Sequence, residues 1–73
     1  MSDYKIEDFT KGQRVVYVPL HAHGDLAHPD CERGAVSSVN AKTVFVKFNK
    51  SVEKFGWDGA TAQGCDPTSL EKE

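Results

Sequence analysis

Residues 34–48 read Gly-Ala-Val-Ser-Ser-Val-Asn-Ala-Lys-Thr-Val-Phe-Val-Lys-Phe. Val44, Val46 and Phe48 are spaced two apart, which is the alternation of a strand with one buried face. The run Asn-Ala-Lys at 40–42 is prone to form a turn, and both runs beside it are rich in β-branched residues. We therefore predict a β-hairpin whose strands are Gly34–Val39 and Thr43–Phe48.

The chain before the hairpin predicts one strand and one long loop. Residues 1–10 are expected to be a lead-in segment that directs Ile6 and Phe9 toward the core. Arg14–Val18 is rich in β-branched and aromatic residues, so it predicts a first strand, which Pro19 should end. Leu20–Arg33 has no sustained hydrophobic periodicity and is expected to be a loop. Loops of this length in a compact domain usually have a function or are held in place by another group.

The chain after the hairpin predicts a second long loop over Asn49–Gly59 and a last strand over Ala60–Cys65. The pair Asp66-Pro67 is a typical start of a short helical turn, which should direct Leu70 inward. Residues 71–73 are expected to be a solvated tail.

Length and composition favour one small soluble domain covering residues 1–73. The formal net charge of -2 argues against general nucleic-acid binding through phosphate contacts. The chain has no apolar run that would span a bilayer and no apolar core of a signal peptide near its start, so a cytoplasmic protein is expected. In that compartment Cys31 and Cys65 are expected to be free thiols or metal ligands.

The order of these elements resembles the SH3-like barrels of the KOW and Tudor type. The motifs that carry the resemblance are Gly12-x-x-Val15-x-Tyr17, Gly34-x-Val36, Val44-x-Val46-x-Phe48 and Pro67-x-x-Leu70. The resemblance implies an all-β fold: a small SH3-like antiparallel β-barrel with two long loops and a short C-terminal helical turn. Closure of the barrel would also hide strand edges that a sheet of this size otherwise exposes.

Three further short segments resemble small uncharacterised proteins encoded by bacteriophages and prophages. They are His21-Ala22-His23-Gly24-Asp25, His28-Pro29-Asp30-Cys31-Glu32 and Val36-Ser37-Ser38-Val39-Asn40. This resemblance implies an accessory role through binding of a host or phage component, and it supplies no catalytic residues.

A candidate binding surface combines aromatic and basic residues around the end of the hairpin. Its members are Phe45, Lys47, Lys50, Phe55 and Trp57. Aromatic rings within a basic rim are typical of protein-binding surfaces, and the same combination binds single-stranded nucleic acid. The alternative is that the lysines are merely solvated and that Phe55 and Trp57 cover one end of the barrel.

A candidate metal site comprises residues that zinc prefers as ligands. They are His21, His23, His28, Cys31 and Cys65. The alternative is that the histidines belong to the loop surface, that Cys31 is a small buried residue, and that Asp25 and Asp30 cap turns. A Cys/His nucleophile would need an orienting group and an oxyanion site, for which the sequence gives no signal.

These features together predict a non-enzymatic module in a phage or bacterial cytoplasm that binds a host or phage protein through the aromatic and basic surface. The first alternative is RNA or single-stranded DNA binding through the same surface. The second is a small module stabilised by zinc.

Overall fold

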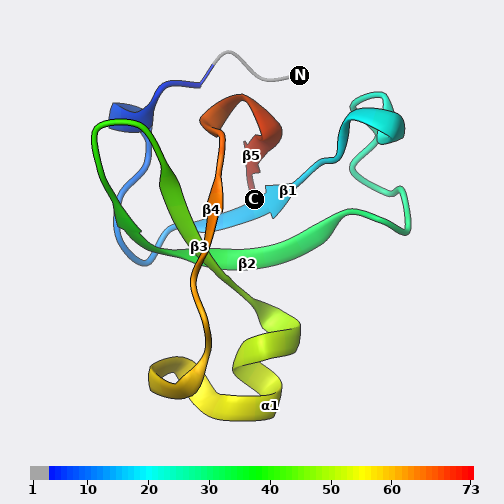
Figure 1. Cartoon of the computed structure of the whole chain (residues 1–73). Coiled ribbons are helices and arrows are strands. Elements are labelled where there is room, and N and C mark those ends of the chain that lie inside the picture. The colour runs from blue at the N-terminus through cyan, green and yellow to red at the C-terminus, as the bar shows by residue number, and fades with distance from the viewer. Residues whose placement is uncertain (1–3) are drawn as a thin grey trace.

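The computed structural model describes residues 4–73, so the first three residues of the predicted lead-in segment lie outside it. Five strands form one antiparallel sheet in the order β4-β3-β2-β1-β5 (Figure 1). The strands are β1 (Arg14–Tyr17), β2 (Glu32–Val39), β3 (Val44–Phe48), β4 (Gln63–Cys65) and β5 (Leu70–Lys72). One α-helix, α1 (Asn49–Gly59), joins β3 to β4, and three 3₁₀ turns are η1 (Ile6–Asp8), η2 (Leu20–Ala22) and η3 (Pro67–Ser69).

The predicted hairpin is confirmed by the pairing of β2 with β3. Val36 lies opposite Val46, and Val39 lies opposite Val44. The side-chain oxygen of Asn40 accepts hydrogen bonds from the backbone N–H groups of residues 42 and 43, both at 2.8 Å, and so closes the turn. The alternating burial of β3 follows the sequence pattern, because Val44 and Val46 are fully buried.

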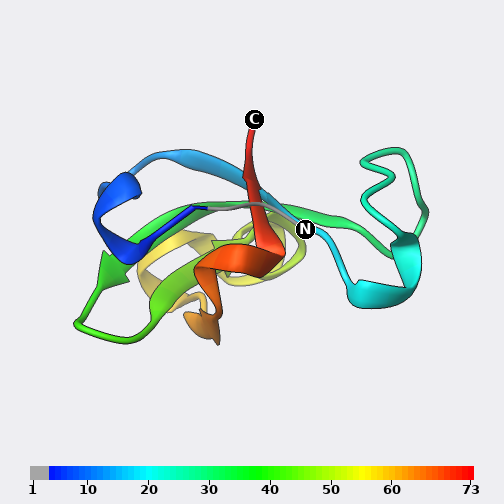
Figure 2. The ribbon, with the colours of Figure 1, turned by 90° about the horizontal axis from the view of Figure 1, so that it is seen from above.

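Two local features of β2 bend the sheet into a curled half-barrel (Figure 2). The register with β3 shifts between Val36 and Ser38, which is a bulge, and a bulge bends its strand and increases its twist. Gly34 lies opposite Phe48, where a Cβ atom would stand 2.6 Å from the carbonyl oxygen of Lys47. Only glycine allows β2 and β3 to approach so closely at this point.

The hydrophobic core fills the inside of this curl. Its members are Phe9, Val15, Val36, Val44, Val46, Phe48, Cys65 and Leu70. Phe9, which follows η1, and Leu70, which begins β5, are both buried, as the sequence predicts. The predicted turn before Leu70 is also confirmed: Asp66 caps η3 by accepting a 2.9 Å hydrogen bond from the N–H of Thr68.

Three expectations about the C-terminal half need correction. Asn49–Gly59 is the helix α1 and not a loop, so the all-β description holds only for the sheet. The last strand is shorter than expected, since β4 covers only Gln63–Cys65. Residues 71 and 72 belong to β5, which pairs with β1 through Val16 and Glu71, so they are not a free tail.

The first long loop is largely as expected, although it contains η2 and ends two residues early, because β2 begins at Glu32. The first strand, β1, ends at Tyr17, one residue before the predicted end at Val18. Pro19 directly precedes η2. In residues 4–73, no helix has the length and apolar character required to cross a membrane.

Candidate functional site

The helix α1 projects from the sheet (Figure 1). It starts directly after β3, with Phe48 as its N-cap residue. Gly56 has a φ of 74°, which interrupts the helical backbone, and its carbonyl accepts a 3.0 Å hydrogen bond from Ala60 N. None of the residues of α1 is buried. The helix therefore presents its side chains at the surface of the molecule.

Lys47 and Trp57, both members of the predicted binding surface, are in direct contact. The Lys47 ammonium group donates a 2.6 Å hydrogen bond to the backbone carbonyl of Trp57. The same Nζ atom lies 4.8 Å from the centre of the Trp57 ring, within the range of a cation–π interaction. This double contact fastens the end of α1 to β3.

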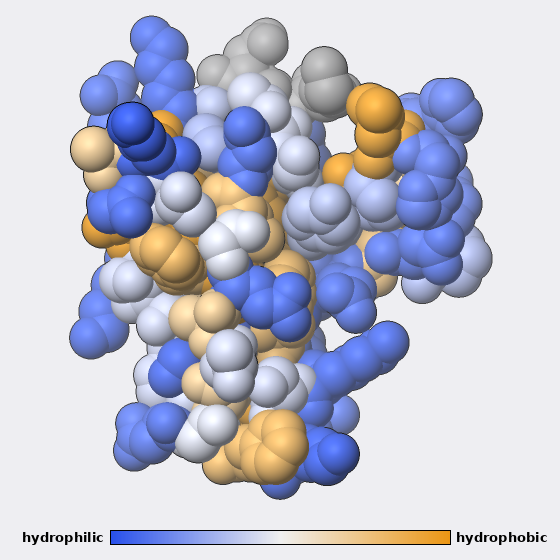
Figure 3. All heavy atoms as spheres, viewed as in Figure 1, coloured by the Kyte–Doolittle hydropathy of each residue, from blue (hydrophilic) through white to orange (hydrophobic). Residues whose placement is uncertain are grey.

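Phe55 is the exposed aromatic residue of α1. Its side chain is 59% exposed, and Lys54 Nζ lies 5.3 Å from its ring centre. Figure 3 shows an apolar area over α1 at the end furthest from the sheet. We define Lys47, Lys54, Phe55 and Trp57 as the α1 surface.

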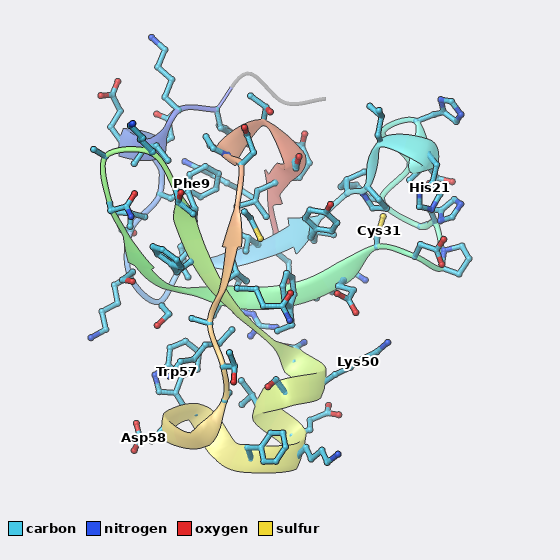
Figure 4. All side chains as sticks on the ribbon, in the orientation of Figure 1. Phe9, His21, Cys31, Lys50, Trp57 and Asp58 are labelled. Carbon is cyan, nitrogen blue, oxygen red and sulfur yellow. The ribbon has the colours of Figure 1, made fainter. Side chains whose placement is uncertain are left out.

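Lys50 and Phe45 do not belong to this group. Lys50 forms an ion pair with Glu32 of β2 at 3.6 Å, and Figure 4 shows it on the opposite side of α1 from Trp57. Phe45 is partly buried on β3 between Ser38 and Gly64. Of the predicted surface, the structure thus places Lys47 and Trp57 in direct contact, and Phe55 lies on the same helix as Trp57.

The second candidate region is the loop between β1 and β2, which stands away from the sheet (Figure 2). A succession of short turns shapes it, through backbone hydrogen bonds that join residues 19 to 22, 22 to 25, 25 to 28 and 28 to 31. Asp25 caps one of these turns, as expected, by accepting a 2.9 Å hydrogen bond from Ala27 N. Ala22 is buried and anchors η2. Hence the loop has a defined backbone despite its lack of regular secondary structure.

This loop brings together His21, His28 and Asp30. His21 Nε2 lies 2.6 Å from Asp30 Oδ2, and the two imidazole rings meet edge to face with centres 5.2 Å apart. His28 Nδ1 accepts a 3.1 Å hydrogen bond from Asp30 N. The hydrogen bond from His21 holds the pKa of the Asp30 carboxyl below its ordinary value. We name these three residues the histidine cluster.

The other predicted metal ligands do not belong to this cluster. His23 has a left-handed backbone, and its side chain lines a hollow next to η3. The Cys31 thiol donates to the Asp25 carbonyl at 3.2 Å (labelled in Figure 4). Cys65 is in the core, where burial and the nearby charge of Glu32 raise the pKa of its thiol to about 11. In contrast, Asp30, for which the sequence favoured turn capping, joins the cluster.

The hollow beside this loop has a volume of about 340 Å³. Its lining residues are Val18, Pro19, Leu20, His23, Gly24, Thr68, Ser69 and Glu71. Leu20 is 77% exposed at its edge. The sequence offered no signal for this hollow, because its two walls come from the first loop and from η3, which are far apart in the chain.

No family model, curated protein or solved structure matches this chain.

Proposed function

We propose that the protein is a non-enzymatic binding module, and that it binds another protein through the α1 surface. The exposed ring of Phe55 is the main support for this proposal, because the helix that carries it buries none of its residues. Exposed aromatic residues are preferred energetic centres of protein interfaces. Trp57, which Lys47 holds in place, would add a second aromatic side chain on the same helix.

A protein partner is favoured over a nucleic acid by the state of the lysines. Nucleic-acid binding needs cations that are free to pair with phosphates. The ammonium group of Lys47 already donates to a backbone carbonyl, and that of Lys50 faces Glu32. The acidic residues Glu53 and Asp58 also lie on α1, where they would repel phosphates. These interactions weaken the basic character that the sequence suggested.

The non-enzymatic part of the proposal draws on the environment of the two thiols. A nucleophilic cysteine needs a low pKa and a base within hydrogen-bond reach. Cys65 has a pKa raised to about 11 by burial, and the Cys31 thiol is directed to a backbone carbonyl. Neither arrangement activates a thiol.

An SH3-like arrangement in a phage or bacterial cytoplasm remains part of this proposal. The strand order β4-β3-β2-β1-β5 and the 3₁₀ turn between β4 and β5 support the SH3-like arrangement. In such a protein the sheet would be the scaffold, and α1, inserted between β3 and β4, would be the specific addition.

Affinity capture from a lysate of the cells in which the protein is made tests this proposal. The native chain, Phe55→Ala and Val39→Ala are immobilised in parallel, each with and without nuclease treatment. Val39 is the matched control because it is an exposed apolar residue of the hairpin, 40% exposed. We expect a protein that the native chain and Val39→Ala retain and that Phe55→Ala loses.

Two results would contradict the proposal. Retention of the same protein by Phe55→Ala would place the interface away from α1. Loss of the partner on nuclease treatment, or a steep decline in binding with added salt, would instead support the nucleic-acid alternative.

A further inference from the structure

The histidine cluster has the chemical composition of a metal site. Each of His21, His28 and Asp30 offers one ligand atom, and these atoms all lie within 4.8 Å of one another. Two imidazole nitrogens and one carboxylate oxygen form a ligand set that zinc accepts, with a fourth position open to water. The set differs from the one that the sequence suggested, since it lacks His23 and has a carboxylate in place of the two thiols.

The backbone of the loop favours this gathering before any ion binds. His21 is the middle residue of η2, which follows Pro19 and is anchored by the buried Ala22. The turn from residue 28 to residue 31 is closed by a 3.0 Å backbone hydrogen bond, so it holds His28 and Asp30 on one side of the loop. A loop already shaped in this way loses less conformational entropy when it binds a ligand.

We propose that His21, His28 and Asp30 bind one Zn²⁺ ion, through His21 Nε2, His28 Nδ1 and Asp30 Oδ2. A tetrahedral ion with bonds of about 2.0–2.2 Å holds its ligand atoms about 3.3–3.6 Å apart. His21 Nε2 and Asp30 Oδ2, now 2.6 Å apart, would separate slightly to admit the ion. The ligand atoms that lie furthest apart would move together by up to about 1.5 Å, which side-chain rotation can supply.

The two rings differ in the change that each ligand atom must undergo before it can bind zinc. His28 Nδ1 carries a lone pair, which now accepts the hydrogen bond from Asp30 N. On metal binding it would exchange this bond for the ion, and water could replace it at the exposed amide. His21 Nε2 now shares a proton with Asp30 Oδ2, so this proton would be released or would move to Nδ1 when Nε2 binds the ion.

The surface position of the cluster determines the kind of site. The side chains of His21 and Asp30 are 62% and 61% exposed. The ion would thus have an open coordination position, unlike a closed structural zinc with four protein ligands. Bound zinc would hold the two ends of the loop together next to the hollow that His23 and Leu20 line. This inference is independent of the partner proposed for α1.

Isothermal titration calorimetry of the untagged full chain with zinc chloride tests this site. The variants His28→Gln and Asp30→Asn each remove one ligand, while His23→Gln and Cys31→Ser are matched controls from the same loop. We expect one zinc ion per chain for the native protein and for both controls. We expect binding at least about tenfold weaker for His28→Gln and for Asp30→Asn, since even indirect changes to a metal site cost about 10–100-fold.

Cobalt substitution provides a second measurement that does not depend on affinity. Cobalt at the proposed site would show ligand-field bands without a thiolate-to-metal charge-transfer band, and calcium would not displace it. The proposal is overturned if the native chain does not bind zinc saturably, if Cys31→Ser abolishes binding, or if the two ligand variants bind as tightly as the native chain.

Discussion

At the residue scale, Gly34 determines how closely the two strands of the hairpin approach. A Cβ atom at this position would lie 2.6 Å from Lys47 O and 2.9 Å from the Cα atom of Phe48. Both of these atoms belong to the backbone of β3, which cannot move without disturbing the paired strand. The curl of the sheet depends on this close approach.

Gly34→Ala should therefore destabilise the protein by about 1–3 kcal/mol, as overpacking of a close contact does. The free energy of unfolding, measured with urea, gives the size of the effect. Gly64→Ala is the control, because there the close atom is the Thr43 methyl group, at 2.9 Å, which a side-chain rotation can move away. Equal losses in the two variants would show that the approach of β2 to β3 is not the cause.

The Cys65 thiol makes the folded state less stable at alkaline pH. Burial raises the pKa of its thiol from 9.0 to about 11. Below pH 9 the thiol is protonated in both states, whereas between these values it ionises in the unfolded chain but not in the folded one. The folded state therefore loses stability as the pH rises through this range.

The variant Cys65→Ala should remove this dependence. It should cost about 1–2 kcal/mol at neutral pH because of the small cavity. Urea unfolding of both proteins from neutral pH to pH 11 measures the difference, which should shrink as the pH rises. A constant difference would mean that the thiol does not contribute to the alkaline loss.

At the element scale, the hairpin and α1 differ in how well the sequence predicts them. Val44, Val46 and Phe48 alternate without interruption, and their burial follows that pattern. Residues 49–59 have few apolar residues and two glycines, so no helical period stands out. Helix α1 depends instead on tertiary contacts, above all the contacts of Lys47, which no local pattern encodes.

Trp57→Ala should loosen α1 and leave the sheet intact. The variant removes the ring that faces Lys47, a contact of about 0.5–1 kcal/mol at an exposed site. We expect a loss of global stability below about 1 kcal/mol, together with faster hydrogen exchange confined to the amides of α1. A loss above about 3 kcal/mol would show that Trp57 instead covers the core, as an aromatic core residue does.

At the scale of the whole molecule, the sequence predicted the core better than it predicted the sites. Phe9, Leu70, Val44 and Val46 are buried as expected because their burial follows from local spacing. The histidine cluster was predicted only in part, since Asp30 meets His21 through the path of the loop and not through a recognisable spacing. Cys65 does not meet the histidines, because β4 places it in the core.

Val46→Asp should unfold the whole domain. Val46 is fully buried in the central hairpin, and an unpaired charge there costs several kcal/mol, comparable to the total stability of a small domain. Circular dichroism and the thermal melting curve show whether the variant folds. Ser38→Asp on the exposed side of β2 is the control and should stay folded. A native-like melting curve for Val46→Asp would contradict the assignment of β3 to the core.

The claim that a partner protein binds on α1 is tested most directly by site-specific photo-crosslinking. Benzoylphenylalanine is placed at position 55 or, as a control, at position 39, and the protein is irradiated in a lysate of the cells that make it. We predict a discrete protein adduct from position 55 that persists after nuclease digestion and is absent from position 39. An adduct from position 39 alone, or one that nuclease removes, would contradict a protein interface on α1.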